Sequence, residues 1–464
     1  MQAVDWITSA VETVNGWVWS PALVVLCLLA ALYFSFRTRF VQVRRFGEMF
    51  KLLFGSVGKD KKSTGISSFQ AFAMALSGRV GTGNIVGVAT AIGFGGPGAI
   101  VWMWIIAFFG AGSAFVEATL AQIYKEDHNG QFRGGPAYYI EKGLRSPFFG
   151  ALFAVLTALA CGIFLPPVQG NSIALSCSRS FGIPAWIIGI IVASLLALVI
   201  IGGVKRIANV AQIVAPVMAM IYIVLAIVVL LVNWQIVPEV FMQMLRGAVG
   251  VNEVSGALLG STIAWGVKRG IYSNEAGQGT GAIVAAAAKV SHPVKQGLVQ
   301  AFSVYIDTLL VCTATALMIL CSGTYNILNA NGELLYAGAP ELANNYVNYT
   351  QSAVDTVFKG FGSQFVSIAM VFFAFSTIMA YYFYAETSII YLFRGREGKG
   401  ENIAIRCFQV LMLAAVVFGA VREADVVWQL GDIGVGLMAW VTVVSILILC
   451  PKAIKALKEF EKVA

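Results

Sequence analysis

Apolar residues occur along this chain in long runs, and short polar segments separate one run from the next. A run of about 20 such residues is enough to cross the hydrocarbon core of a bilayer as an α-helix. The pattern therefore predicts a helical protein that crosses a membrane many times. The runs give about eleven spans, at about 16–36, 69–94, 99–124, 147–168, 185–201, 210–232, 256–288, 296–322, 361–393, 403–421 and 426–449.

The run 69–94 differs from the others because glycines and a charge interrupt its middle. Gly78, Gly81 and Gly83 lie close together, and each glycine costs a helix about 1 kcal/mol relative to alanine. Arg79 adds a charge that is expensive at this depth unless it faces protein or water. Unwound backbone is tolerated at the membrane midplane only where protein or a cavity surrounds it. The pattern predicts a helix that is broken at these glycines.

A second run, 256–288, is too long and too polar for one simple helix. We expect a break beside Gly266 and an inner half that emerges at Lys289. When the first span is set aside, the interrupted helices are the first and the sixth of the remaining ten. Interrupted helices in corresponding positions of two halves indicate an inverted repeat with the binding site at its interface. The predicted fold is all-α and polytopic, with a five-plus-five inverted repeat and one extra N-terminal helix.

Composition and charge agree with a membrane protein. The chain is 58% hydrophobic and only 12% charged, whereas a soluble domain carries about 25% charged residues. The net charge of +8 does not require nucleic acid as a partner, because the basic residues concentrate in short loops between the runs. The positive-inside rule then places segments 37–62 and 394–399 and the tail after Pro451 in the cytoplasm, with the N-terminus outside.

The sequence also predicts how the chain is divided into segments, and it argues against a signal peptide, a cysteine metal site and disulfides. The start lacks a basic n-region, so we expect no cleaved signal peptide. The cysteines are scattered without CxxC or Cys/His spacing, so these residues indicate neither a metal site nor a disulfide framework. We divide the chain into the extra N-terminal helix with its basic segment (1–62), the first repeat with the start of the second (63–288), the rest of the second repeat (289–450) and a basic cytoplasmic tail (451–464).

The first break has groups that could bind a carboxylate. A half-helix that begins near Thr82 presents free N–H groups and the positive end of its dipole, and Asn84 adds a polar side chain. The alternative is close packing between helices, because Gly83 and Gly87 have the GxxxG spacing. A nucleotide-binding loop fits poorly, since Val86 stands where GxGxxG has its last glycine.

The second run offers a wall for a small solute and a group of charges. Trp265 beside Gly266 could limit the size of the solute, or it could be an ordinary core aromatic residue. We interpret Lys268, Arg269 and Glu275 as a salt-bridge network toward the inner end rather than as substrate ligands.

Other polar residues within the spans leave alternatives open. Ser376 and Thr377 either bond back to the preceding turn or supply oxygens to a sodium ion together with carbonyls of the broken helix. Gln169 is either a solute contact or the cap of its helix. The remaining buried carboxylates are candidates for proton coupling or for pairing with Arg79; they are Glu117, Asp307 and Glu386.

One stretch carries a resemblance to a known family. Residues 95–104, Gly-Gly-Pro-Gly-Ala-Ile-Val-Trp-Met-Trp, with Gly110 at the end, resemble the signature of the alanine or glycine:cation symporters. Val101 is the one departure, because the signature usually has phenylalanine there. Residues 81–85, 265–270 and 273–277 are similar to other hallmarks of that family, so the resemblance covers nearly the whole chain.

The resemblance implies the fold of the neurotransmitter:sodium symporters with one extra N-terminal helix. It also implies uptake of alanine or glycine with Na⁺, or in some members with protons. Arg79 departs from an uncharged residue in some members. The residues expected at the amino acid are Thr82, Gly83, Asn84 and Gln169, to which the reading above adds Gly81, Trp265 and Gly266. The residues expected at Na⁺ are Ser77, Val80 and Phe373 through their carbonyls, and Ser376 and Thr377 through their hydroxyls.

Taken together, these features predict a multi-pass symporter of the plasma membrane that works by alternating access. The partners we expect are alanine or glycine, a cation and the lipid bilayer, with no nucleic acid and no obligatory protein partner. No Walker sequence, HExxH or GxSxG is present, which argues against ATP-driven transport and against an enzyme. The rivals are a proton-coupled transporter of another small amino acid and a channel, although one chain shows no pore ring.

Overall fold

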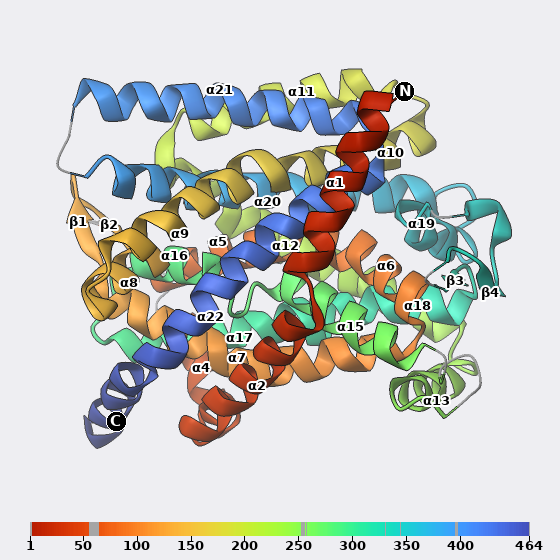
Figure 1. Cartoon of the computed structure of the whole chain (residues 1–464). Helices are drawn as coiled ribbons and strands as arrows, with labels where there is room; N and C mark the ends of the chain where they lie inside the picture. Colours follow the sequence, from red (N-terminus) through yellow and green to blue (C-terminus); the bar gives the residue numbers. More distant parts are fainter. Residues whose placement is uncertain are drawn as a thin grey trace.

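The computed structural model describes residues 2–54, 65–251, 256, 258–329, 331–343, 345–394 and 398–463. The long helices lie roughly side by side in one bundle (Figure 1). Helix α8, the hairpin β1–β2 and the C-terminus lie at one end of this bundle, and α13, α19 and the strands β3–β4 lie at the other. We call these the β1 end and the β3 end.

The elements follow one another as α1 (Gln2–Val18), α2 (Pro21–Arg37), α3 (Val41–Arg44), α4 (Phe46–Phe54), α5 (Ser68–Arg79), the π-helix η1 (Gly83–Gly87), α6 (Val88–Gly95), α7 (Gly98–Tyr124), β1 (Glu126–His128), β2 (Gln131–Arg133), α8 (Pro136–Leu144), α9 (Pro147–Leu159), the π-helix η2 (Ala160–Phe164), α10 (Leu165–Phe181), α11 (Ala185–Ile200) and α12 (Gly203–Val232). They continue as α13 (Val237–Ala248), α15 (Leu259–Asn274), α16 (Thr280–Ala287), α17 (Pro293–Val304), the π-helix η3 (Tyr305–Cys312), α18 (Thr313–Ser322), β3 (Asn326–Leu328), β4 (Leu334–Ala337), the 3₁₀-helix η4 (Pro340–Leu342), α19 (Val347–Asp355), α20 (Gly362–Leu392), α21 (Lys399–Val421) and α22 (Ala424–Val463).

Eight helical stretches of the described chain are long and apolar enough to cross a membrane. Two shorter apolar helices, Gly83–Gly95 and Ala185–Ile200, accompany them. The prediction of a helical, multi-pass membrane protein is therefore confirmed. The predicted total of eleven spans also counts α11 and the two interrupted helices, and that total and the inverted repeat stay predictions.

The first interrupted helix is broken where the glycines lie. Helix α5 ends at Arg79, and Val80 takes an extended conformation with ψ 90°. The chain becomes helical again in the π-helix η1, which α6 continues. We call residues 80–82 break 1. The start of α5 is fixed by a capping box, in which Ser67 and Gln70 bond to each other's backbone N–H groups.

The second interrupted helix is broken further along than predicted. Helix α15 runs through Gly266 without interruption, so the expected break at that glycine is wrong. A Cβ atom at Gly266 would lie 2.5 Å from the Ala99 carbonyl oxygen of α7, which shows that this glycine serves close packing. The break lies at residues 275–279, which we call break 2, and three of its residues have positive φ: Glu275, Gly277 and Gly279.

Three predicted spans or segments have different ends in the structure. The helix predicted to stop at residue 168 continues through η2 and α10 to Phe181, which leaves Gln169 inside a helix rather than at its cap. Helix α22 continues through Pro451 to Val463, so the predicted tail is helical where it is described. Residues before the first predicted span form α1, which packs against α22. Of the basic segment 37–62, residues 55–62 lie outside the described chain.

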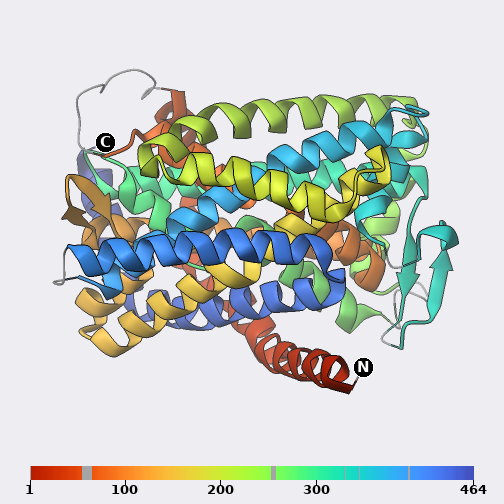
Figure 2. The same ribbon diagram turned by 90° about the horizontal axis from the view of Figure 1, so that it is seen from above.

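The two broken helices lie in the centre of the bundle and meet at the β1 end. A short parallel bridge joins Ile66, just before α5, to Ala288, just after α16. The Ile66 N–H donates to the Ala287 carbonyl at 3.2 Å, and the Lys289 N–H donates to the Ile66 carbonyl at 3.0 Å. Helices α7, α12, α17 and α20 pack around this pair, and Figure 2 shows the bundle from above. A movement of one broken helix at this end is thus passed to the other.

Candidate functional site

Break 1 holds backbone N–H groups against two side-chain oxygens. The Gly81 N–H donates to Asn84 Oδ1 at 2.8 Å, and the Thr82 N–H donates to Gln169 Oε1 at 3.2 Å. All four residues are buried. The structure therefore brings together the residues that were predicted at the start of the half-helix, and Gln169 reaches them from α10. The site can hold acceptor oxygens, which is what a carboxylate would present.

The packing alternative also has support at this break. A Cβ atom at Gly83 would lie 3.2 Å from Ser273 Cα, and one at Gly87 would lie 3.7 Å from Arg269 Cδ. Both glycines thus face α15. The close approach of η1 to α15 at Gly83 brings the two broken helices into contact beside break 1.

A buried carboxylate ties break 1 to the end of α15. Asp307, on the π-helix η3, is fully buried and accepts a hydrogen bond from Asn84 Nδ2 at 2.6 Å. The Ser273 hydroxyl lies 3.1 and 3.0 Å from its two oxygens, and Thr308 Oγ1 lies 2.7 Å from Oδ2. These partners are neutral. π-Helical turns are frequently found at functional sites, and here two of them, η1 and η3, supply Asn84 and Asp307.

The oxygens predicted for Na⁺ also lie together, where α20 crosses break 1. Thr377 Oγ1 lies 2.8 Å from the Ser77 carbonyl oxygen, 3.4 Å from that of Val80 and 3.0 Å from that of Phe373. The Ser376 hydroxyl donates to the same Phe373 carbonyl at 2.9 Å. A hydroxyl has one hydrogen to donate, so acceptor oxygens exceed donors here. Several neutral oxygens around one point are what a hard monovalent cation requires.

Trp265 lies apart from break 1, on the wall of a cavity of about 970 Å³ between α1, α6, α15 and α22. Its ring stacks on Phe94 with 4.6 Å between ring centroids. The cavity extends from Val86, four residues beyond break 1, to Leu342 near the β3 end. Gly266 faces α7 instead, so the structure does not bring it to the other candidate substrate residues.

Lys268 and Arg269 face this same cavity and pair with an acid that the sequence reasoning missed. Lys268 Nζ lies 2.8 Å from Asp432 Oδ2, and Arg269 forms bonds of 2.7 and 3.1 Å with both Asp432 oxygens. Glu275 is not part of this group, so the predicted network of these three residues is wrong. The position of Asp432 inside the predicted span 426–449 could have revealed this pairing, because charges within membrane helices are rare and usually paired.

Arg79 connects the two breaks. Its Nε donates to the Asn274 carbonyl at 2.6 Å, directly before break 2, and its Nη1 bonds to Gln300 and Ser303 of α17. The described residues place no carboxylate oxygen within 4.0 Å of Arg79. The predicted pairing of Arg79 with Glu117, Asp307 or Glu386 is thus not formed as a direct ion pair.

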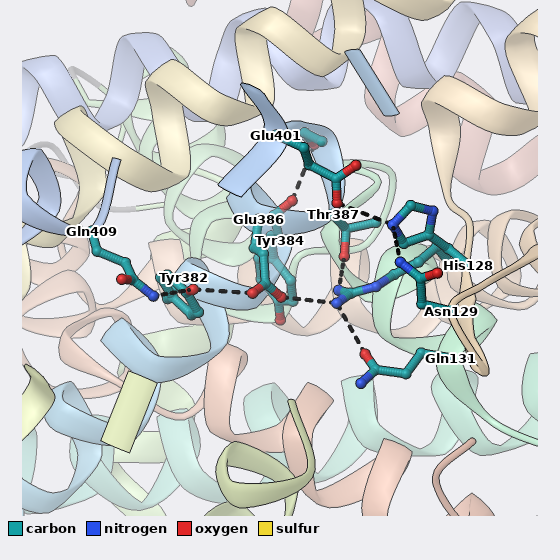
Figure 3. Close-up of polar contacts among 11 residues, drawn as sticks. His128, Asn129, Gln131, Tyr382, Tyr384, Glu386, Thr387, Glu401 and Gln409 are labelled. Atoms are coloured by element: carbon teal, nitrogen blue, oxygen red, sulfur yellow. Dashed lines mark hydrogen bonds and ion pairs between the residues drawn. The ribbon is translucent and has the colours of Figure 1, made fainter. Parts of the chain in front are cut away.

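Glu386 belongs to a polar network at the β1 end (Figure 3). Arg133 of β2 pairs with it at 3.0 Å and donates to Thr387 at 2.8 Å, and Tyr382 donates to its other oxygen at 3.0 Å. His128 of β1 lies 3.1 Å from Glu401 of α21. The hairpin is thereby bonded to α20 and α21.

A second set of ion pairs joins α8 to the same region. Arg394 bonds to both oxygens of Glu141 at 2.5 Å and to Glu126 at 3.2 Å. Partial burial acts to raise the pKa of Glu141, but the hydrogen bonds from Arg394 and Tyr391 outweigh it, so the pKa lies below its usual value. These contacts join α8 and β1 to the segment after α20 at the β1 end, whereas the cavity lies on the side of the β3 end.

The chain is similar to known proteins over nearly its whole length. The model of the sodium:alanine symporter family matches residues 4–464 of the chain. A Bacillus subtilis (strain 168) protein with the provisional name sodium/proton-dependent alanine carrier protein YrbD is 52% identical over 452 residues, 97% of this chain and 92% of that protein. The sodium/proton-dependent alanine carrier protein of Bacillus sp. (strain PS3) is 46% identical over 408 residues, 88% of this chain and 90% of that protein.

A solved structure shares the fold at low sequence identity. The crystal structure of MhsT in complex with L-phenylalanine matches with a TM-score of 0.52 and 14% identity, covering 85% of this chain and 98% of that chain. At this identity the likeness concerns the fold alone, and a fold by itself does not determine the substrate.

Proposed function

Because the chain belongs to the sodium:alanine symporter family, we propose that it carries alanine or glycine across the membrane together with Na⁺ by alternating access. Two Bacillus relatives have names that describe alanine carriers dependent on sodium or protons, which supports the choice of substrate and cation. The family is one of transporters, and we expect no enzymatic activity.

In this proposal the substrate carboxylate binds at break 1. The N–H groups of Gly81 and Thr82 donate to its oxygens in place of Asn84 Oδ1 and Gln169 Oε1, and the start of the half-helix favours the negative charge. The ammonium group then lies toward the buried Asp307 carboxylate, which Asn84 holds in place. Gly83 leaves room for a short side chain only, because Tyr272 and Ser273 approach it closely.

Na⁺ binds in the proposal between break 1 and α20, at the carbonyls of Ser77, Val80 and Phe373 and the hydroxyls of Ser376 and Thr377. The observation that carries the proposal is the contact of Thr377 Oγ1 with the Ser77 and Val80 carbonyls, immediately before the amides that receive the carboxylate. A ligand shifts a conformational equilibrium only through differential affinity for the two states. Sharing of break 1 by both ligands supplies that coupling.

We further propose that the protein lies in the plasma membrane with the β3 end and the N-terminus outside and the C-terminus in the cytoplasm. The basic residues of the α3–α4 segment and of the C-terminal part of α22 fall at the β1 end, as the positive-inside rule describes. The cavity then faces outside. Trp265 lines its wall and limits what reaches break 1, while Gly266 acts only by packing α15 against α7.

The test is reconstitution of the purified protein into liposomes with an inward Na⁺ gradient. Radiolabelled alanine should accumulate above equilibrium, and Thr82→Trp should lose alanine uptake and binding because break 1 has no room for an indole. Gly182→Ala is the control: a Cβ atom there would meet no other atom within 4 Å, so the variant adds backbone strain at a positive φ without crowding the site. Downhill flux at the rate of a channel, or normal uptake by Thr82→Trp, would overturn the proposal.

A further inference from the structure

We propose that Glu117 and Glu275 share one exchangeable proton at break 2, and that this proton moves with the substrate. The inference rests on the proposed function and adds to it a second cation site that differs in chemistry from the Na⁺ site at break 1.

Both carboxylates are buried, and in each of them one oxygen accepts a hydrogen bond. Glu117, on α7, has an exposed fraction of 1%, and its Oε1 accepts the Gly277 N–H of break 2 at 3.5 Å. Glu275, within break 2, has an exposed fraction of 0%, and its Oε2 accepts the Tyr384 hydroxyl at 3.2 Å. The second oxygen of each carboxylate has no hydrogen-bond partner within 3.5 Å in the described structure, although the Gly279 N–H lies near Glu117 and the Thr280 hydroxyl near Glu275. A buried ionised carboxylate without partners is expensive, so these oxygens require a cation or a proton.

Among the described residues, the guanidinium that acts on the two acids is that of Arg79, and its hydrogen bonds go to other residues. Arg79 is 1% exposed, and its Nε and Nη1 form hydrogen bonds with Asn274, Gln300 and Ser303. Its Nη2 has no partner in the described chain. It attracts both carboxylates without forming an ion pair shorter than 4.0 Å. One guanidinium and two ionised carboxylates leave one negative charge in the interior, and one proton makes the group neutral.

A proton fits this place better than a metal ion. The groups that face the acids are mainly donors, namely the N–H groups of Gly277 and Gly279, the hydroxyls of Thr280 and Tyr384 and the Arg79 guanidinium. The positive charge of Arg79 repels a metal cation. At break 1 the opposite holds, because carbonyl and hydroxyl oxygens of neutral groups gather there. Two carboxylates that repel each other favour holding one proton between them.

The other titratable groups around the acids are themselves uncharged or acidic. Tyr139 of α8 faces Glu117. Asp307 of η3, Cys161 of η2 and Tyr381 of α20 face Glu275 together with Tyr384. Asp307 adds a further negative charge when it is ionised. In the part of the chain that the structure describes, these surroundings therefore add no second positive charge that could replace the proton.

The geometry also couples this proton to break 1. The Tyr384 hydroxyl that bonds to Glu275 lies against Gly78, where a Cβ atom would be only 2.1 Å away. Arg79 follows directly and bonds to the residue before break 2. A change of charge at Glu275 therefore alters the contacts of Tyr384 and Arg79 in the last turn of α5. Because coupling between two binding sites is reciprocal, binding at break 1 also affects the proton at break 2.

The experiment measures proton movement in liposomes that contain a pH-sensitive dye, with equal Na⁺ on both sides and the membrane potential clamped. Addition of alanine to wild-type liposomes should acidify the interior. Glu117→Gln and Glu275→Gln should reduce this acidification at least tenfold, and Glu117→Asp should restore part of it. Glu239→Gln, at an exposed position of α13, is the matched control and should behave as wild type.

Calorimetric titration of the wild-type protein with alanine, in two buffers of different ionisation enthalpy, needs no variant and should show proton uptake near neutral pH. Acidification and proton uptake that are absent while Na⁺-driven alanine accumulation persists overturn this inference and leave the proposed function intact. Acidification that survives in both glutamine variants overturns the site. Absence of any alanine accumulation by the wild type overturns the proposed function itself.

Discussion

Break 1 and break 2 interrupt neighbouring helices of one bundle, and their surroundings differ in charge. Around residues 80–82 the side chains that bond directly to the unwound backbone are neutral, namely those of Asn84, Gln169 and Thr377. The Asp307 carboxylate bonds to Asn84 and not to this backbone. Around residues 275–279 the partners are two acids and an arginine, and several of their atoms have no partner in the described structure.

The difference shows that an unwound stretch does not by itself determine what it binds. Free N–H and carbonyl groups are present at both breaks, because unwinding removes the helical hydrogen bonds wherever it occurs. The side chains that surround each break decide whether a zwitterion with a metal cation or a proton is favoured. Four predictions test whether break 1 binds the substrate and Na⁺ while break 2 holds the proton.

The largest effect is expected from a branched side chain at break 1. A Cβ atom at Gly81 would lie 2.3 Å from Thr377 Oγ1 and 3.2 Å from Gln169 Oε1, so Gly81→Val should abolish Na⁺-driven alanine uptake. Gly87→Ala is the control, because its Cβ would have no contact closer than 3.7 Å. Uptake in liposomes measures both. Equal activity of the two variants would show that break 1 is not the binding region.

The next effect concerns the cation at break 1. Thr377→Ala removes the hydroxyl that contacts the Ser77 and Val80 carbonyls, so the Na⁺ concentration for half-maximal uptake should rise about tenfold, equivalent to ~1.4 kcal/mol. Ser388→Ala removes a hydroxyl of the same helix that bonds only to the preceding turn, and it should leave the Na⁺ dependence unchanged. A shift of equal size in both variants would mean that α20 itself, and not the Thr377 oxygen, is responsible.

A smaller effect is expected on stability at break 2. Gly279 has φ +95°, and a Cβ atom there would lie 2.6 Å from Pro136 and 2.9 Å from Thr442. Gly279→Ala should therefore destabilise the protein through overpacking by about 1–3 kcal/mol, in addition to the left-handed strain of about 1–2 kcal/mol. Gly182→Ala has positive φ without such contacts and should show the strain alone. Thermal unfolding in detergent compares them, and equal midpoints would contradict the close packing of break 2.

The smallest effect is expected from a pH change at the β1 end, where Glu141 should not titrate in the range in which the acids of break 2 exchange a proton. The pKa of Glu141 is lowered, because the hydrogen bonds from Arg394 outweigh partial burial. Its stabilising effect is therefore complete above the usual value of 4.5 and is lost only as the pH falls through the lower folded value. The change in melting temperature caused by Glu141→Gln should be the same at pH 5.5 and pH 8. A difference would show that the β1 end also titrates in this range.

The sequence allowed the position of break 1 to be predicted but not that of break 2. At break 1, glycines and an intramembrane arginine coincide with the point where α5 ends. At the second helix the glycine beside Trp265 was misleading, because Gly266 allows α15 to approach α7. A glycine in a membrane helix serves close packing as readily as unwinding, and only the neighbouring helix distinguishes the two.

The partners of the buried charges were also beyond the sequence. Arg269 pairs with Asp432, which lies far along the chain, and Glu386 pairs with Arg133 of the hairpin. From the sequence alone, Lys268 and Arg269 were grouped with Glu275 and three acids stayed open for Arg79, because pairing depends on which helix faces which. The described structure supplied the choice.

By itself the sequence determined that this chain is a multi-pass helical membrane protein, because the length and polarity of its runs leave a bilayer as their only suitable solvent. It also determined where one helix must open, since local penalties accumulate there. Only the tertiary structure decided that Gln169 and Thr377 close around that opening, that the second opening lies at residues 275–279, and that acids rather than neutral oxygens surround it. Those facts depend on contacts between residues distant in the chain, and no local pattern encodes them.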